Sequence, residues 1–402
     1  MMRYLSAGES HGRCLVAIIE GLPAGLEISA AAINRHLARR QQGYGRGGRM
    51  AIEKDRVEFL AGLRFNRTLG SPLALQIINR DWDNWCQIMA PEGEPPPQAV
   101  PVTRPRPGHA DLAAAIKYNH GDLRQVLERS SARETAIRTA VGSVARLMLE
   151  RFGFAFYSRV VSIGPYAAAA PGREINWPEL AERVEKSPLR CDDAEAEAKM
   201  LEAVEQARRR GDTLGGVFEV AVTGVPPGLG SHVHWERRLD GRLAGALMSI
   251  QGIKGVEIGS GFASASVYGS ALHDPIEISP EKGITRPSNR AGGLEGGISN
   301  GQTLVLRAAM KPIPTLARPL PSVDLCARKP SPGAVERSDV CAVPAAAVVA
   351  EAVVAWELAV AFREKFAGDF IEEVEAAYDY YLEHVRSFLG AGDRIRDSGD
   401  RG

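Results

Sequence analysis

The sequence has few of the features that mark secreted, metal-binding or membrane proteins. Its five cysteines are scattered along 402 residues and form no Cys-x-x-Cys pair. This pattern favours reduced thiols over a disulfide framework or a zinc site. Arg3, Glu9 and Arg13 interrupt any apolar run near the start, so no signal peptide is predicted. We therefore expect a cytoplasmic protein without a metal site.

The chain also lacks net charge, because 49 basic side chains balance 49 acidic ones. Proteins that bind nucleic acids in general carry a basic excess, so we expect no nucleic-acid partner. The most membrane-like stretch, Cys341–Phe362, contains Pro344, Glu351 and Glu357. Acidic groups are costly at the centre of a membrane, so this stretch predicts a buried helix and no membrane partner.

Two common nucleotide-binding motifs are missing as well. No Gly-x-Gly-x-x-Gly follows a strand and opens a helix, and no Gly-x-x-x-x-Gly-Lys-Ser/Thr occurs. Their absence argues against a Rossmann dinucleotide fold and a P-loop. Glycines gather instead in two loops, Gln41–Met50 and Ser288–Gly301. Bare glycine backbone lets an anion or a planar ligand approach main-chain N–H groups closely.

What remains is an ordinary globular composition, with 45% apolar and 24% charged residues. A chain of this length can bury about three quarters of its surface without disulfides or metals. We expect one domain over residues 1–390 and a flexible tail over residues 391–402.

A weak internal sequence repeat suggests that the chain consists of two related halves. VAIIEGLPAGL (Val16–Leu26) and VAVTGVPPGL (Val220–Leu229) each predict a strand, a Gly-x-Pro-x-Gly turn and then a helix. The two segments lie about half a chain apart, and no flexible linker separates them. We therefore expect an α+β fold in which two related halves share one core.

Arginine is concentrated in one part of the chain. The segment Arg35–Arg67 holds eight Arg and one Lys against three acids, and Arg46 and Arg49 lie within its glycine-rich loop. Arginine suits bidentate binding of phosphate or carboxylate. The segment predicts an anion site, with a solvated basic face or a subunit contact as the alternative.

The motif RSSARET (Arg129–Thr135) opens a predicted helix, Ser131–Phe152, in which Ser131 and Glu134 fit a capping box. A helix N-terminus accepts phosphate readily. The arginines on either side of the motif's centre favour a phosphate site over a plain helix cap.

Two histidines lie in polar, glycine-bearing turns: His11 in GESHG and His109 in RPRPGHAD. Such histidines suit proton transfer, although a lone loop histidine is more often a surface residue. In the C-terminal half, KPIPTL (Lys311–Leu316) and ERSDVCAVP (Glu336–Pro344) follow the second glycine-rich loop.

Taken together, these segments resemble the chorismate synthase family. The motifs run in family order: GESHGR (8–13), RRQQGYGRGGRMAIEKD (39–55), NRDWDNW (79–85), RPGHAD (106–111), RSSARETA (129–136), KGVEIGSGF (254–262), NRAGGLEGGISNG (289–301), MKPIPTL (310–316) and RSDVCAVPAAAVV (337–349). The resemblance implies a β-α-β sandwich of two related halves, assembled as a homotetramer. It implies a carbon–oxygen lyase that converts 5-enolpyruvylshikimate 3-phosphate to chorismate and phosphate by 1,4-anti elimination, the last common step towards the aromatic amino acids.

The resemblance also implies a need for reduced FMN, although the reaction has no net redox change, and NADPH as the source of reductant. We expect a separate flavin reductase. By the family pattern, His11 would protonate the departing phosphate with support from Ser10, and His109 would manage flavin protonation. Asp339 would help to relay the proton removed from the substrate carbon.

Family binding roles transfer to matching positions. Substrate anions would be held by Arg40, Arg46, Arg49, Arg106, Arg133 and Arg337, of which the first two are also associated with NADPH. The flavin would be surrounded by Arg129, Ser130, Ser131, Gln251, Gly252, Gly296, Lys311, Pro312, Ile313, Pro314, Thr315 and Arg337. Glu128 departs from the glycine of many family members, and Gln251-Gly252 varies a family segment.

Two rival functions use the same residues. A flavin- or NADPH-dependent oxidoreductase acting on a phosphorylated substrate would consume reductant in step with its product. A non-enzymatic RNA- or anion-binding module would use the Arg35–Arg67 segment and would need no flavin.

Overall fold

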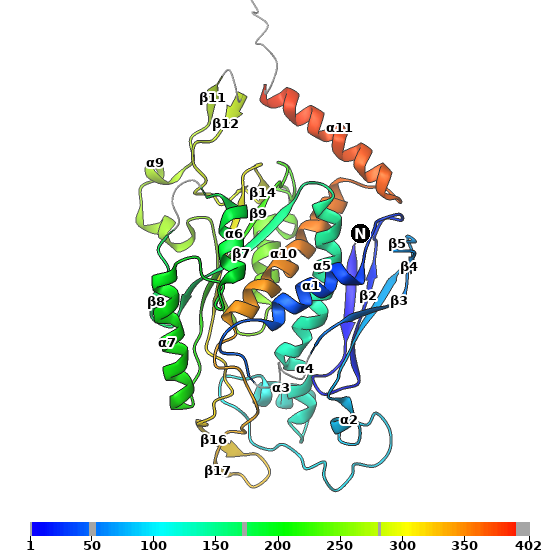
Figure 1. Ribbon diagram of the computed structural model, residues 1–402, viewed down its shortest axis with the longest axis vertical. Helices are drawn as coiled ribbons and strands as arrows, with labels where there is room; N and C mark the ends of the chain where they lie inside the picture. The colour runs from blue at the N-terminus through cyan, green and yellow to red at the C-terminus, as the bar shows by residue number, and fades with distance from the viewer. Residues whose placement is uncertain (1, 48–53, 171–174, 280–282, 391–402) are drawn as a thin grey trace, which may run out of the picture.

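A computed structural model describes residues 2–47, 54–170, 175–279 and 283–390. Two antiparallel sheets flank a layer of helices, as Figure 1 shows, with the N-terminal sheet on one side and the second sheet on the other. The tail 391–402, expected to be flexible, lies outside the described residues.

The first sheet alternates apolar and polar side chains, as a strand with one buried face does. Leu15, Ala17 and Ile19 of β2 face the core, whereas Ile18 is exposed on the outer face. The strand order is β1-β2-β6-β3, and its members are β1 (Arg3–Ala7), β2 (Cys14–Glu20), β6 (Leu73–Ile78) and β3 (Val57–Ala61).

The second sheet is more deeply buried, because Phe218, Val220, Ala221 and Val222 of its central strand are all inaccessible. Its order is β10-β15-β9-β7-β8, and its members are β10 (Ile253–Ile258), β15 (Leu304–Met310), β9 (Gly216–Thr223), β7 (Ala155–Ile163) and β8 (Tyr166–Ala167).

The two halves repeat one topology. In chain order the first half runs β1, β2, α1 (Ala30–Gln41), β3, β6 and α5 (Thr135–Glu150). The second half runs β7, β9, α8 (Leu239–Met248), β10, β15 and α10 (Val343–Lys365). Corresponding strands occupy corresponding places in the two sheets. The expected α+β fold with two related halves is confirmed, and the two Gly-x-Pro-x-Gly turns follow the equivalent strands β2 and β9.

Helix α10 is the apolar stretch that was expected to be a buried helix, and this is confirmed. It is long and apolar enough to cross a membrane, but 94% of its most apolar window is buried inside the protein. Its buried Glu351 accepts hydrogen bonds from Arg39 (2.7 Å), Arg146 (2.6 Å) and Ser158 (2.6 Å). Burial alone would raise the pKa of Glu351, yet the neighbouring guanidinium groups hold it well below its ordinary value.

Helices α5 and α10 cross in close contact at Gly142. A Cβ atom placed on Gly142 would lie 2.2 Å from the carbonyl oxygen of Ala352. We therefore expect Gly142→Ala to destabilise the protein by about 1–3 kcal/mol, the usual cost of overpacking. Thermal unfolding measures the effect. Gly245→Ala on α8 is the matched control, because nothing lies within 4 Å of its Cβ position. That variant should be as stable as the parent or more so, since alanine favours helices. Equal losses in both variants would contradict the close crossing.

Further elements are attached to this core. Helices α6 (Trp177–Lys186) and α7 (Ala194–Arg210) precede β9, and α11 (Ile371–Leu389) follows α10 at the edge of the molecule (Figure 1). Short elements fill the connections: β4 (Leu63–Arg64), β5 (Arg67–Thr68), α2 (Trp82–Trp85), α3 (Asp111–Tyr118), α4 (Arg124–Ser130), η2 (Ala132–Glu134), η3 (Trp235–Arg237), η4 (Gly261–Ser266), α9 (Gly269–Leu272), β11 (Glu277–Ser279), β12 (Gly283–Thr285), β13 (Leu294–Glu295), β14 (Ile298–Ser299), β16 (Pro321–Asp324) and β17 (Lys329–Pro332).

Ser131 and Glu134 do not form the reciprocal hydrogen bonds of the expected capping box. The helix opens with the 3-10 turn η2, and the Ser131 hydroxyl accepts from the N–H of Arg133 at 3.3 Å. The carboxylate of Glu134 accepts from the side chain of Gln251 at 3.1 Å, and within the described part of the chain it accepts no hydrogen bond from the Ser131 backbone N–H. A long-range contact to the second half replaces the local one.

Candidate active site

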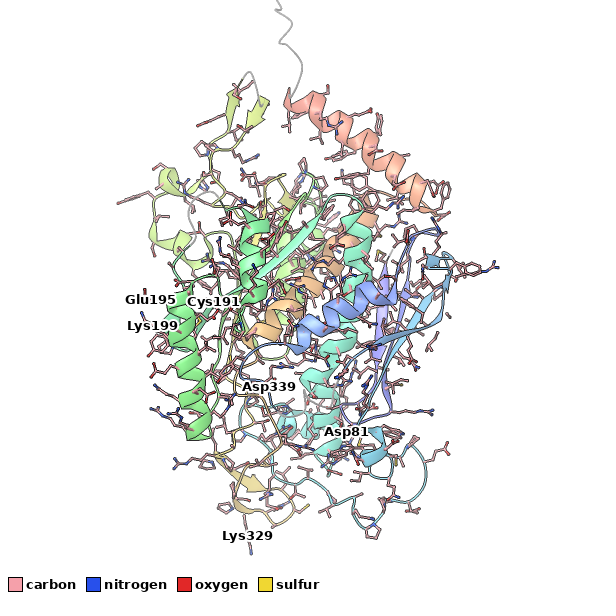
Figure 2. The ribbon with its side chains drawn as sticks, in the orientation of Figure 1. Asp81, Cys191, Glu195, Lys199, Lys329 and Asp339 are labelled. Carbon is pink, nitrogen blue, oxygen red and sulfur yellow. The ribbon has the colours of Figure 1, made fainter. Side chains whose placement is uncertain are left out.

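A cavity of about 530 Å³ lies at the end of the helical layer where α5 and α10 begin. This volume falls in the usual range of small-molecule sites. Its walls come from the β1–β2 turn, from the end of α1 and the loop after it, from the turn between α8 and β10, and from the long connections that precede α5 and α10. Figure 2 places Asp81 and Asp339, one from each connection, near this end of the layer.

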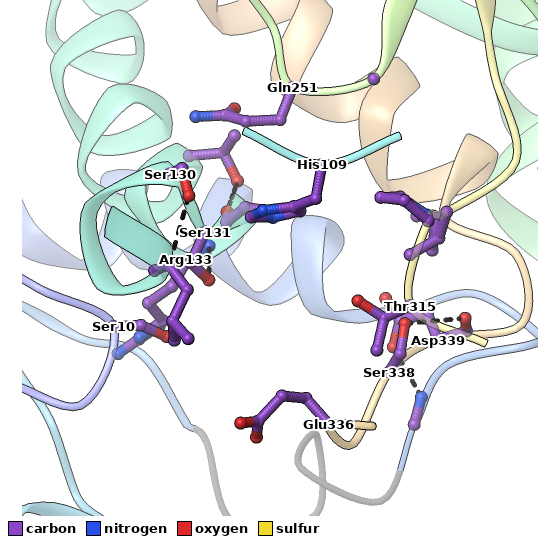
Figure 3. A pocket seen from close by; sticks show the side chains of 18 of the residues that line it. Ser10, His109, Ser130, Ser131, Arg133, Gln251, Thr315, Glu336, Ser338 and Asp339 are labelled. Carbon is purple, nitrogen blue, oxygen red and sulfur yellow. Dashed lines mark hydrogen bonds between the residues drawn. The ribbon is translucent and has the colours of Figure 1, made fainter. Parts of the chain in front are cut away.

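The connections bring predicted residues together that are far apart in sequence. Figure 3 shows Ser10, Ser131 and Arg133 on one side of the open space, with Thr315 and Asp339 across from them. The lining includes most of the residues proposed from sequence: Ser10, His11, Arg40, Arg46, Arg106, His109, Ser130, Ser131, Arg133, Gln251, Gly252, Lys311, Pro312, Ile313, Pro314, Thr315, Arg337 and Asp339.

Three residues proposed from sequence are not part of this lining. Arg49 lies outside the described residues. Arg129 lies at the end of α4 and donates to the carbonyl oxygens of Gly8 (3.1 Å) and Ser6 (3.0 Å). Gly296 lies in the turn between β13 and β14. Neither Arg129 nor Gly296 reaches the cavity within this chain. Their assignment to a flavin site therefore stays a prediction.

Arg40 and Arg133 share a carboxylate partner behind the lining. Arg133 donates to both oxygens of Asp55 at 2.6 Å, and Arg40 lies 3.5 Å from the same carboxylate. Arg40 also donates to Thr135 at 2.9 Å. A protein carboxylate therefore offsets the like charges near this helix start, where the sequence alone suggested a bound anion.

Arg46 and Asp339 form an ion pair across the two halves, with Arg46 Nη1 2.8 Å from Asp339 Oδ2. The backbone N–H of Gly47 donates to the other oxygen of Asp339 at 2.6 Å. A Cβ atom on Gly47 would lie 2.8 Å from the carbonyl oxygen of Ser338, so the loop needs glycine there. These contacts fix the Asp339 carboxylate at the cavity edge.

His109 is oriented by a carboxylate. Its Nδ1 lies 2.6 Å from Asp111 Oδ1, and because a carboxylate only accepts, Nδ1 carries the hydrogen in this contact. Arg106 donates to the same Asp111 at 2.8 Å and to Thr315 at 3.0 Å. Burial alone would raise the pKa of Asp111, but the hydrogen bonds from His109 and Arg106 hold it well below its ordinary value.

His11 is oriented in the same way from another segment. Its Nδ1 lies 2.9 Å from Glu128 Oε1, and its ring stacks on Trp85 with centroids 3.9 Å apart. The indole N–H of Trp85 donates to Asp81 at 3.1 Å. Both histidines on the lining therefore have a carboxylate on Nδ1, which favours a hydrogen on that nitrogen, and Nε2 of His109 lies 3.3 Å from Arg106 Nη2.

Sequence reasoning missed the supporting carboxylates and the indole. Asp55, Asp111, Trp85 and Asp81 all lie within motifs that were quoted above, yet nothing in their local spacing identified their partners. Asp111 had the clearest signal, because it follows His109 by two residues. Glu128 attracted notice only as a departure from the family pattern.

The second part of the lining suits a planar cofactor. The Nε2 of Gln251 is held by Glu134, while its buried Oε1 has no partner among the described residues. Gly252 has φ +87°, and a Cβ there would lie 3.1 Å from the Met310 side chain. The ammonium group of Lys311 donates to the carbonyl oxygen of Gly108. An unpaired amide oxygen, a bare glycine and a cation in one wall fit the polar ring edge of a flavin.

The site as a whole defines a class of protein. Six cationic side chains and two carboxylate-supported imidazoles face one cavity, together with the carboxylates of Asp81, Glu336 and Asp339. Such a lining is that of an enzyme acting on a small substrate with several negative charges.

Comparison with known proteins identifies the family. A family model described as chorismate synthase matches residues 2–362. The chain is 59% identical to a chorismate synthase of Moorella thermoacetica over 388 residues, and 58% identical to one of Desulforamulus reducens over 386 residues. Each alignment covers 96% of this chain and 100% of the relative. A solved crystal structure of chorismate synthase superposes with a TM-score of 0.78 at 45% identity, covering 96% of this chain and 99% of that one.

This chain belongs to the chorismate synthase family. It is a lyase of aromatic amino acid biosynthesis, and the expectation drawn from its motifs is confirmed. The family assignment excludes the RNA-binding module and the oxidoreductase as the primary function.

Proposed function

We propose that the cavity catalyses the 1,4-anti elimination of phosphate from 5-enolpyruvylshikimate 3-phosphate, yielding chorismate, and that it needs reduced FMN. The observation that carries the proposal is the convergence, at one end of the helical layer, of five arginines and two carboxylate-supported histidines from both halves of the chain.

The substrate carries a phosphate and two carboxylates, about −4 near neutral pH. Burying such a molecule requires cations and hydrogen bonds around it. In the proposal, Arg40, Arg46, Arg106, Arg133 and Arg337 supply them, together with Arg49 of the glycine-rich loop. The carboxylates behind the lining hold three of these guanidinium groups in place, so that little side-chain entropy is lost on binding.

His11 acts in the proposal as the proton donor to the departing phosphate. A fully ionised phosphate is a poor leaving group, and a positioned acid improves it. Nδ1 of His11 is engaged by Glu128, so Nε2 delivers the proton. Ser10, whose backbone N–H donates to the carbonyl oxygen of Glu128 at 3.0 Å, helps to fix the turn that carries His11.

His109 and Asp339 complete the proton handling. His109 exchanges a proton through Nε2 next to the wall that suits the cofactor. Asp339 helps to relay the proton removed from the substrate carbon, while Arg46 and the Gly47 N–H orient its carboxylate.

Ser130, Ser131, Gln251, Gly252, the Lys311–Thr315 segment and Arg337 would hold the flavin. Reduced flavin supplies electron density to the breaking C–O bond, and the protein contributes its orientation. In the proposal, NADPH is the source of reductant and contacts Arg40 and Arg46. A separate flavin reductase reduces the FMN.

We also propose a cytoplasmic homotetramer. Leu5 and Ile18, which pair across β1 and β2, expose 78% and 52% of their surfaces on the outer face of the first sheet, and Ile78 on β6 adds to this face. An apolar sheet face of this kind is suited to contact with another copy.

The direct test is to incubate the purified protein with 5-enolpyruvylshikimate 3-phosphate and dithionite-reduced FMN under nitrogen. Chorismate and phosphate should appear together in equal amounts. Phosphate release without chorismate would indicate a hydrolase and would contradict the proposal.

Arg133→Ala should raise the KM for the substrate strongly, because a charged hydrogen bond is worth about 1.5–3 kcal/mol. The sequence predicts the same for Arg49→Ala. Steady-state kinetics measure the effect, and thermal unfolding shows whether the variant is folded, since the substitution removes one of the two arginines that pair with the buried Asp55. Arg151→Ala, which removes a partly exposed ion pair with Glu375, is the control and should keep its KM. A folded Arg133→Ala protein with the parent's KM would contradict the anion site.

A further inference from the structure

Glu128 lies behind the cavity lining, and its carboxylate is almost fully buried against His11. Only 2% of its side chain is exposed, and it is not part of the cavity lining. Its Oε2 accepts the backbone N–H of His11 at 2.7 Å, and its Oε1 lies 2.9 Å from His11 Nδ1. One carboxylate therefore holds both the backbone and the ring of His11.

The ring of His11 also contacts an indole and borders the cavity. One ring face stacks on Trp85, which is itself held by Asp81. The guanidinium carbon of Arg124 lies 5.2 Å from the centroid of the same Trp85 ring, and Arg124 Nη1 lies 3.3 Å from Glu128 Oε1. Glu9 and Arg13 flank His11 in its own turn. The ring also borders the cavity with the charged lining described above.

Glu128 remains ionised in this environment. Burial alone would raise the pKa of its carboxyl, but the hydrogen bonds from His11 and the charge of Arg124 hold it below its ordinary value. An ionised carboxylate on Nδ1 fixes the tautomer of a neutral imidazole and stabilises the protonated ring.

We infer that Glu128 is a positioning residue for the elimination: it keeps His11 in the Nδ1–H form and directs Nε2 to the departing phosphate. The inference rests on the proposed role of His11. In the step itself, the N–H bond at Nε2 breaks as an O–H bond forms on phosphate. The ring is left neutral with Nδ1–H still donated to Glu128, and it regains a proton from water after the product leaves.

Glu128→Gln tests this assignment, because the amide keeps an acceptor oxygen and nearly the same shape but loses the charge. We expect kcat to fall about 10–100-fold, the range seen when the carboxylate partner of a functional histidine is removed. KM should change little, since Glu128 does not touch the cavity. The descending limb of the kcat–pH profile should move to lower pH, because the protonated ring loses its stabilising neighbour.

A double-mutant comparison separates action through His11 from general damage. In a His11→Gln background, the added Glu128→Gln change should lower kcat no further. Glu219→Gln is the matched control: Glu219 lies on β9 away from the lining, is equally buried, and pairs with Arg159 of β7 and Arg307 of β15. It should leave the shape of the pH profile unchanged.

The outcomes are distinguishable. If His11→Gln alone keeps its activity, the proposed role of His11 fails. If His11→Gln loses activity but Glu128→Gln keeps the parent's kcat and pH profile, or if its loss is equally large without His11, only the role of Glu128 is overturned. Should Glu128→Gln not fold, ¹⁵N spectra of the histidine-labelled parent protein decide: the neutral His11 ring should carry its hydrogen on Nδ1, and a hydrogen on Nε2 would overturn the inference.

Discussion

Replacing His11 or His109 by alanine is expected to lower kcat by about 10²–10⁴-fold, as the loss of a general acid or base typically does, while the protein stays folded. Both rings lie on the cavity lining, and each is fixed by a carboxylate at Nδ1: Glu128 at 2.9 Å and Asp111 at 2.6 Å. Neither imidazole contributes to the apolar core, so the loss should fall on the rate and not on stability.

His384→Ala is the matched control. His384 is exposed on α11, where its ring neighbours are Tyr381 and Phe388. The variant should have the kcat of the parent. Rate measurements on the three variants, each checked by thermal unfolding, test the assignment. Equal losses at all three positions would mean that folding and not proton transfer had been damaged.

Much of the architecture could be predicted from the sequence, because local patterns determine it. The repeated Gly-x-Pro-x-Gly motif follows the equivalent strands β2 and β9, and it therefore predicted that the two halves repeat one topology. Helix α10 was predicted from a long apolar run. The acidic residues in that run argued against a membrane-spanning helix and for a buried one. The family motifs named most of the cavity lining without any knowledge of the fold.

What the sequence could not supply were the partners. Arg133 meets Asp55 across 78 positions, and His11 meets Glu128 across 117. No local spacing encodes such contacts, since the fold alone brings the segments together. The sequence also could not show which basic side chains of Arg35–Arg67 reach the cavity. Arg39 points instead to Glu351 and Glu185, whereas Arg40 and Arg46 line the cavity.

The second large effect concerns the state of the flavin. We expect activity to be lost in air without a reductant, because oxidised flavin cannot lend electron density to the breaking C–O bond. Substrate and products differ by phosphate and not by electrons, so each turnover should leave the flavin reduced. In the proposal, the reduced flavin binds at the cavity wall formed by Gln251, Gly252 and Lys311.

The most direct test of the account is the amount of chorismate formed per reduced FMN supplied under nitrogen, with the absorbance of oxidised flavin followed in parallel. The account predicts many chorismate molecules per flavin and no growth of the oxidised band. A ratio that stays at one, with the flavin ending oxidised, would show a stoichiometric reductant and would contradict an elimination without net redox change.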